Sequence, residues 1–240
     1  MLIRHPLIAT GFMLASFAAF TCDSPSSCNA AGSKLYAQGK YTAAMKSFER
    51  QVDLATGEGD ENSLRVGLNN LALSADRLGR PLEAHAWLQV AMQRFPEDGA
   101  TQHNLALVRK RMPTLQPGGV ISGIYRRYAG YGKWSVLRVR SIGGGSHQLQ
   151  FDIFRYGKAP SADAFGPAAA GELEAHSMLV NGRLEASYSP WGESPCNFHL
   201  ELTELALNIP PQDMPSRCEF GGQGIHLNGK FWLTAADSRP

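Results

Sequence analysis

The chain has 240 residues, of which 43% are apolar, and its formal net charge is +2. This apolar fraction is typical of a packed globular protein and excludes an intrinsically disordered one. A charge so close to zero excludes the broad basic surface of a dedicated nucleic-acid-binding protein. The length allows one domain or two.

Residues 1–21 have the pattern of a secretory signal peptide. A short basic start precedes an uncharged apolar run from Leu7 to Phe20. The run suits the apolar region of a signal peptide and is short for a membrane span, so we favour a cleaved signal over an uncleaved anchor. We expect a periplasmic or secreted protein with no transmembrane span in the mature chain. A lipid on Cys22 is an alternative that would anchor the protein to a membrane, although Ala19-Phe20-Thr21 fits a lipobox poorly.

The four cysteines are Cys22, Cys28, Cys196 and Cys218. An even number behind a signal peptide indicates disulfides formed in an oxidising compartment. Pairing within each end of the chain is the simplest of the three connectivities, and it would join Cys196 to Cys218. The sequence leaves open whether Cys22 pairs with Cys28, carries a lipid or is free. The spacing matches neither a zinc ribbon nor a thioredoxin-like redox site.

Residues 25–112 contain an internal repeat with helical periodicity. The segment Asn70-Leu71-Ala72-Leu73 recurs as Asn104-Leu105-Ala106-Leu107, an offset of 34 residues. Gly79 lies in the turn between two predicted helices, where it ends the first without a Cβ penalty, and Pro96 ends the second. In its period and in these positions the segment resembles the tetratricopeptide repeat (TPR) family, whose repeats are pairs of antiparallel helices.

The first repeat is less regular than the second. Gly32 and Phe48 fit the family pattern, but Gln51 replaces the usual alanine and the closing proline is missing. Residues 57–62 add length between the repeats, so we expect the first helix pair to lie at an unusual angle. A fifth helix, about Asp98 to Arg111, has no partner helix after it and would cap the last repeat. With fewer than three full repeats, the module is expected to depend on the second half of the chain for stability. The alternative is a generic pair of helical hairpins.

The second half of the chain is predicted to be all-β. Residues 113–119 form a linker, because prolines and glycines break the helical pattern there. Residues 120–236 then alternate between apolar and polar side chains. Asn181-Gly182 and Asn228-Gly229 each predict a two-residue hairpin, and Gly143-Gly144-Gly145 predicts a turn. The predicted strands are 121–128, 133–140, 148–153, 171–180, 183–189, 197–207, 225–227 and 230–234, and residues 159–170 are a predicted surface loop.

Seven or eight short strands are typical of a small antiparallel β-barrel or sandwich. The predicted fold class is therefore α+β with two domains, in which five helices of TPR type precede this β-domain. The Gly123-Ile124-Tyr125 strand and a late Cys196–Cys218 disulfide followed by Gly221-Gly222 are similar to small secreted β-domains of the lysozyme-inhibitor type. Some inhibitors of this type carry an S-G-x-x-Y loop, whereas Ser122-Gly123 is followed by tyrosine one residue earlier, so we assign no inhibitor residue.

Charge is unevenly distributed within the β-domain. Residues 118–160 hold seven lysines and arginines against one acidic residue, Asp152. We attribute this pattern to cross-strand ion pairs and solvated faces. The alternative is a basic surface for an acidic partner or a lipid headgroup.

We predict no catalytic residue, no metal site and no cofactor, and therefore a protein that is not an enzyme. The chain has no GxSxG elbow, no HExxH and no P-loop. Its histidines lack metal-ligand spacing, and a structural role for His199 and His226 is favoured over a metal site.

In the TPR family the first helix of each repeat lines a concave face that binds a partner. The resemblance therefore implies partner-binding residues at the matching positions of three predicted helices. These are Asn29, Ser33, Tyr36, Asn69, Leu73, Asp76, His103, Leu107 and Lys110. Amide and hydroxyl groups can hydrogen-bond a peptide backbone, and the leucines offer apolar contact. We assign Asn70 and Asn104 to local packing instead.

These patterns favour a non-enzymatic cell-envelope protein that binds a partner protein or peptide through a TPR groove, as an adaptor or scaffold. The alternative is a periplasmic inhibitor or immunity protein whose β-domain blocks a cell-wall hydrolase or toxin. The sequence leaves open the identity of the partner and the oligomeric state.

Overall fold

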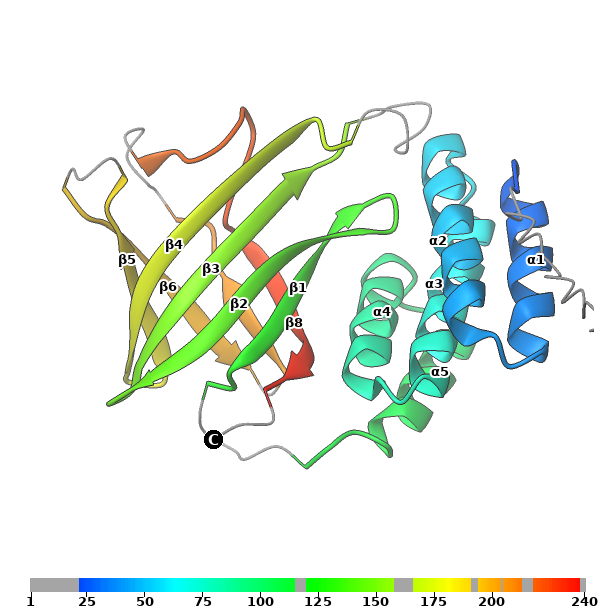
Figure 1. Cartoon of the computed structure of the whole chain (residues 1–240), viewed down its shortest axis with the longest axis horizontal. Coiled ribbons are helices and arrows are strands. Elements are labelled where there is room, and N and C mark those ends of the chain that lie inside the picture. Colours follow the sequence, from blue (N-terminus) through cyan, green and yellow to red (C-terminus); the bar gives the residue numbers. More distant parts are fainter. Residues whose placement is uncertain are drawn as a thin grey trace, which may run out of the picture.

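A computed structural model describes residues 22–114, 120–157, 166–190, 194–203, 205–212 and 218–237. Within these residues, five helices precede a closed barrel of eight antiparallel strands (Figure 1). The predicted α+β class is confirmed, and of the two β architectures left open the chain adopts the barrel. The predicted signal peptide, residues 1–21, and residues 115–119 of the predicted linker lie outside the described residues.

The helices form where the repeat pattern predicts them. Gly79 follows the first helix of the second repeat with a left-handed φ of 73°, and the next helix ends at Arg94, before Pro96. Ala72 and Ala84 are fully buried, so neighbouring helices pack closely at these positions. The helices are α1 (Pro25–Ala37), α2 (Tyr41–Glu58), α3 (Glu61–Arg77), α4 (Pro81–Arg94) and α5 (Gly99–Arg109).

The prediction that residues 57–62 add length between the repeats is wrong in one respect, because most of them are helical. Only Gly59 and Asp60 connect α2 to α3. Gly59 has a left-handed φ of 71°, and the Asp60 side chain accepts a hydrogen bond from the Ser63 backbone N–H at 3.0 Å. These two caps allow a reversal in two residues. The extra residues lengthen α2, which has 18 residues against 14 in α4.

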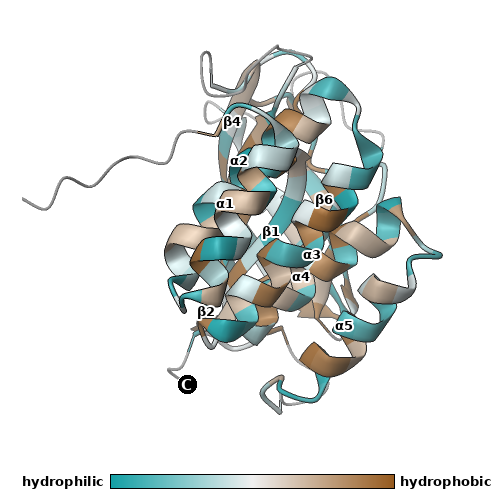
Figure 2. Ribbon diagram, turned by 90° about the vertical axis from the view of Figure 1, so that its right-hand side faces the viewer, coloured by the Kyte–Doolittle hydropathy of each residue, from teal (hydrophilic) through white to brown (hydrophobic). Residues whose placement is uncertain are grey.

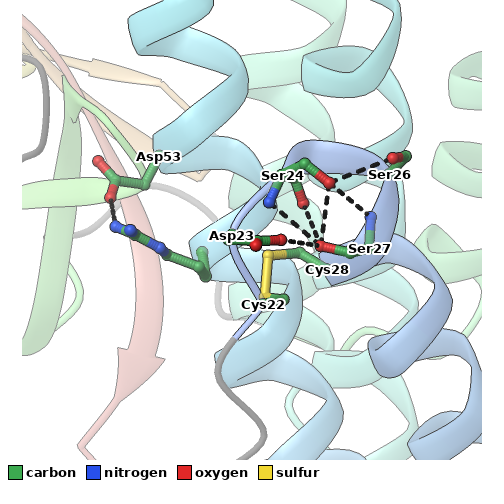
Figure 3. Close-up of a disulfide and its surroundings, with 8 residues drawn as sticks. Cys22, Asp23, Ser24, Ser26, Ser27, Cys28 and Asp53 are labelled. Carbon is green, nitrogen blue, oxygen red and sulfur yellow. Dashed lines mark hydrogen bonds and ion pairs between the residues drawn. A yellow bond between two sulfur atoms is a disulfide. The ribbon is translucent and has the colours of Figure 1, made fainter.

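Two disulfides pair the cysteines within each end of the chain, which confirms the predicted Cys196–Cys218 pair and shows Cys22 paired with Cys28, an alternative that the sequence left open. Cys22–Cys28 holds the residues before α1 against its first turn (Figure 3). In the same turn Ser24 caps the helix, since its Oγ accepts a hydrogen bond from the Ser27 backbone N–H at 3.2 Å. The second disulfide is Cys196–Cys218 in the β-domain.

Each strand of the barrel pairs with the next, and the last closes on the first. Alternate side chains point inward, and the largest of them are fully buried: Leu137, Leu149, Phe151, Leu184, Leu200, Phe231 and Leu233. The interior is therefore a packed core and not a channel. The strands are β1 (Gly123–Gly130), β2 (Lys133–Gly143), β3 (Ser146–Arg155), β4 (Ala169–Val180), β5 (Arg183–Tyr188), β6 (Cys196–Thr203), β7 (Ala206–Ile209) and β8 (Gly229–Ala236).

Two strand predictions are wrong. Residues 197–207 do not form one strand, because they contain most of β6 and the start of β7, which pair as a hairpin. Residues 225–227 form no strand, and β8 pairs instead with β7 and β1. By contrast, Asn181-Gly182 makes the predicted hairpin with φ values of 50° and 80°, and the glycines of 143–145 make the predicted turn. Of the predicted loop 159–170, residues 159–165 lie outside the described residues, and residues 169 and 170 belong to β4.

The barrel packs against the helical module at α4, the helix nearest to it (Figure 1), and Gly132 in the β1–β2 turn lies against Glu49 and Val52 of α2. The Trp87 side chain of α4 is almost fully buried, and its ring meets that of Trp134 on β2 edge-on at 4.4 Å between centroids. Tyr128 on β1 completes this cluster, 6.2 Å from Trp87 and 5.7 Å from Trp134. A shared aromatic cluster of this kind indicates that the two parts support one another.

A buried histidine lies in the same interface. His85 on α4 packs edge-on against Trp232 on β8, with ring centroids 5.6 Å apart. Burial, with a smaller contribution from Arg109, lowers the pKa of His85 from 6.5 to about 4. At the margin of the interface, Glu83 forms an ion pair with Arg126 of β1 at 3.6 Å.

His85 makes the stability of the protein depend on pH. Between about pH 6.5 and pH 4 the unfolded chain binds a proton at His85 that the folded chain does not, so acid lowers the free energy of unfolding. We expect wild type to lose about 2–3 kcal/mol more than His85→Gln between pH 7 and pH 4.5. Urea unfolding of both proteins at the two pH values measures this difference. An equal loss in both would show that His85 takes up its proton in the folded state.

Candidate functional site

Eight of the nine residues predicted to bind a partner lie on α1, α3 and α5, and Lys110 directly follows α5. Hydrogen bonds join these three helices. Arg77 of α3 donates from Nε to the Tyr36 hydroxyl of α1 at 3.1 Å. Arg111, just after α5, forms an ion pair with Asp76 of α3 at 2.6 Å. The side chains therefore belong to one continuous surface, which we call the α1–α3–α5 face. In Figure 2 the helices lie in front of the strands of the barrel.

The asparagines form two separate sets of hydrogen bonds between the helices of the module. Asn70 donates from Nδ2 to Asn29 Oδ1 at 2.9 Å, and Asn104 donates from Nδ2 to Asn69 Oδ1 at 2.9 Å. Asn69 in turn donates to the Thr101 hydroxyl at 2.8 Å, and only 7% of it is exposed. The packing role predicted for Asn70 and Asn104 is confirmed. The two acceptors, Asn29 and Asn69, are predicted site residues, and their side-chain amides already form hydrogen bonds within the module.

The other predicted residues differ in what they can offer a partner. The side chains of Tyr36 and Asp76 are held by arginines, whereas Leu73 is half-buried. Leu107 is 36% exposed and is one of four exposed large apolar side chains among the described residues, the others being Ile142, Met178 and Val180. The exposed members of the face are Ser33, His103, Leu107 and Lys110.

Sequence reasoning missed the two arginines that cross this face. Neither Arg77 nor Arg111 lies at a position that the family pattern assigns to the groove, so no signal pointed to them. The hydrogen bond that Arg77 donates to Tyr36 raises the pKa of its guanidinium. Arg77 and Lys110 form no ion pair within 4 Å among the described residues, so the face carries uncompensated positive charge.

The barrel leaves this face uncovered. Its hydrogen bonds, ion pairs and ring contacts with the helices involve α4, as at Glu83 and Trp87, and α2, as at Thr56 with Tyr128. In the part of the chain that the structure describes, no such contact joins α1, α3 or α5 to a strand. The second helix of each repeat thus faces the barrel, and the first faces away from the strands.

No protein-family model matches this chain, and neither a curated protein nor a solved structure is significantly similar to it. The assignment of the helices to the TPR family therefore stays a prediction.

Among the described residues, no three histidine, cysteine, aspartate or glutamate side chains lie close enough together to hold a metal ion. None of the described helices has the length and apolarity that a membrane span requires. The predicted structural histidines His199 and His226 lie on β6 and in the segment before β8.

Proposed function

We propose that this protein is a non-enzymatic binding protein of the cell envelope, and that its α1–α3–α5 face holds a segment of a partner protein. One observation carries the proposal: among the described residues the barrel meets the helices at α2 and α4, and no hydrogen bond, ion pair or ring contact joins a strand to α1, α3 or α5. A barrel in this position also supports a module too short to be stable by itself. The barrel then acts as a platform that presents the helical surface.

The composition of the face indicates the chemistry of the partner. Leu73 and Leu107 provide apolar contact at corresponding positions of α3 and α5. Arg77 at the end of α3 and Lys110 directly after α5 provide positive charge close to these two leucines. We therefore propose an acidic peptide segment with an apolar anchor residue, because opposite charge steers association and the apolar contact supplies affinity.

Two disulfides fit an extracellular or periplasmic protein, because disulfides persist in oxidising compartments. We propose a periplasmic or secreted location, reached through the predicted signal peptide at residues 1–21. A cysteine sulfur cannot carry a lipid and form a disulfide at once. The Cys22–Cys28 disulfide therefore favours a mature protein without a lipid on Cys22.

Photo-crosslinking of the full chain in the periplasm tests the proposal. A photoreactive residue in place of the exposed His103 should capture a partner. Leu107→Arg, one helical turn away, should reduce that capture about tenfold or more, because it places a charge where an apolar anchor binds. The matched control is Ile142→Arg, the same kind of change at a side chain on the barrel that is 51% exposed. Undiminished capture by Leu107→Arg would overturn the assignment.

The alternative function, an inhibitor or immunity protein, draws support from a separate feature. Ile142, Met178 and Val180 are 51%, 52% and 39% exposed, and they lie beside the β2–β3 and β4–β5 turns at one end of the barrel. An exposed apolar end of this kind is suited to a protein interface. Under this alternative, Ile142→Arg would weaken binding of a cell-wall hydrolase and Leu107→Arg would not.

A further inference from the structure

The end of the barrel at which β1 and β3 finish and β8 begins is crossed by residues 218–228 (Figure 1). Two clefts of about 550 Å³ and 250 Å³ lie beside this segment. They share Gly224, Ile225, His226 and Asn228 in their walls, so they adjoin one another. Their size suits a small organic molecule. Because Phe151 and Phe231 fill the interior beneath, a ligand would lie in this mouth and not inside the barrel.

Arg127 contributes a positive charge to the smaller cleft. It lies two residues after the buried Tyr125, on the inward side of β1, and its guanidinium lies 5.0 Å over the Phe231 ring. Its Nη1 donates to the carbonyl oxygens of Leu227, at 3.1 Å, and of Asn228. These contacts hold the guanidinium in place while Nε and Nη2 form no hydrogen bond with the described residues.

Arg155 brings a second guanidinium to the same cleft from the end of β3. Its Nε donates to the Gln223 carbonyl oxygen at 3.1 Å. Gly224 lies against it, since a Cβ there would be 3.1 Å from Arg155 Nε. The backbone N–H groups of Gly224 and His226 form no hydrogen bond with the described residues. The cleft is thus lined by unused donors from side chains and from the backbone.

Among the described residues, no carboxylate compensates these two arginines. Most of the described arginines form an ion pair, for example Arg138 with Asp152 and Arg126 with Glu83, but no carboxylate of the described residues lies within 4 Å of Arg127 or Arg155. Burial lowers the pKa of Arg127 to about 10, which reflects the cost of holding this charge without a counterion. An anion bound in the cleft would remove that cost.

We propose that this mouth of the barrel is a binding site for a small organic molecule that carries a carboxylate or phosphate group beside an apolar portion. Arg127 and Arg155 bind the anionic group, with the backbone N–H groups of Gly224 and His226 as further donors. Ile153, Phe154 and Ile225 line the cleft beside them and contact the apolar portion. The site is separate from the α1–α3–α5 face and does not depend on the function proposed for it.

Calorimetric titration of the mature full chain with hexanoate, hexyl phosphate and neutral hexanol, at constant ionic strength, tests the site. We expect at least one of the two anions to bind and hexanol not to bind. Arg155→Met removes one cation at an exposed position and should weaken binding at least tenfold. Arg140→Met is the matched control, because Arg140 is also exposed on the barrel without an ion pair within 4 Å and lies away from the cleft.

The anion that binds identifies the ligand class, since hexanoate indicates a carboxylate and hexyl phosphate a phosphate. Arg127→Met keeps an apolar stem over Phe231 and should also weaken binding. If this variant fails to fold, Arg155→Met decides the question alone. The proposal is overturned if hexanol binds as well as the anions, if neither anion binds, or if Arg155→Met binds as tightly as Arg140→Met.

Discussion

Replacing Trp87 with alanine is expected to lower the free energy of unfolding by about 3–5 kcal/mol. The Trp87 side chain is 1% exposed, and its removal leaves a large cavity between helix α4 and strands β1 and β2. The change also removes its edge-on contacts with Trp134 and Tyr128. Because these rings are shared by the helical core and the barrel, the loss should affect both parts together.

Urea unfolding followed by circular dichroism at helix and strand wavelengths measures the effect. Wild type should give one cooperative transition at both wavelengths, and Trp87→Ala should move both to lower urea. A double-mutant cycle with Trp134→Ala should give a coupling free energy of about 0.5–1.5 kcal/mol. If Trp87→Ala shifted the helical signal and left the strand signal unchanged, the interface would contribute nothing to the stability of the barrel.

The helices could be predicted from the sequence because their determinants are local. The repeat of 34 residues, Gly79 after α3 and Pro96 after α4 all act within a few residues of the helix they end. The Asn181-Gly182 hairpin is predictable for the same reason, since both residues favour positive φ. By contrast, no glycine or proline marks the short connection between β6 and β7. With no turn signal there, residues 197–207 were predicted as a single strand.

Tertiary contacts decide the features that sequence reasoning missed. Asn228-Gly229 has a hairpin signal, yet residues 218–228 cross the end of the barrel instead of pairing with β8. The Cys196–Cys218 disulfide and the contact with β4 hold this segment there. The sequence alone gives the spacing of such residues and not their distance in space.

In the candidate sites too, features set by local sequence could be predicted, whereas features set by tertiary contacts could not. The residues of the α1–α3–α5 face can be predicted from their positions within each helix. The hydrogen bonds that Arg77 and Arg111 donate cannot, because they join helices that only tertiary packing brings together. The basic character of residues 118–160 is visible in the sequence and was attributed to ion pairs and solvated faces. Arg138 fits that interpretation, whereas Arg127 and Arg155, on β1 and β3, share a cleft without a carboxylate. Pairing of both strands with β2 brings those two side chains to one end of the barrel, where each donates a hydrogen bond to the segment 218–228.

The position of residues 218–228 can itself be tested by adding one methyl group. Gly221 has a left-handed φ of 77°, and a Cβ there would be 2.4 Å from Gly171 Cα and 2.5 Å from the Ala170 carbonyl oxygen. Both atoms belong to the backbone of β4, so neither can move aside as a flexible side chain could. Gly221→Ala combines the cost of a left-handed alanine with that of overpacking, and we expect a loss of about 3 kcal/mol in the free energy of unfolding.

Gly144→Ala is the control that separates these two costs. Gly144 also has a left-handed φ, 61°, but a Cβ there would have no neighbour within 4 Å. Its substitution should therefore cost only the conformational part, about 1–2 kcal/mol, as measured by urea unfolding of both variants. The difference between the variants reports how closely the segment packs on β4. Equal losses would mean that residues 218–228 do not rest on that strand, and the walls of the cleft beside Arg127 and Arg155 would then lie elsewhere.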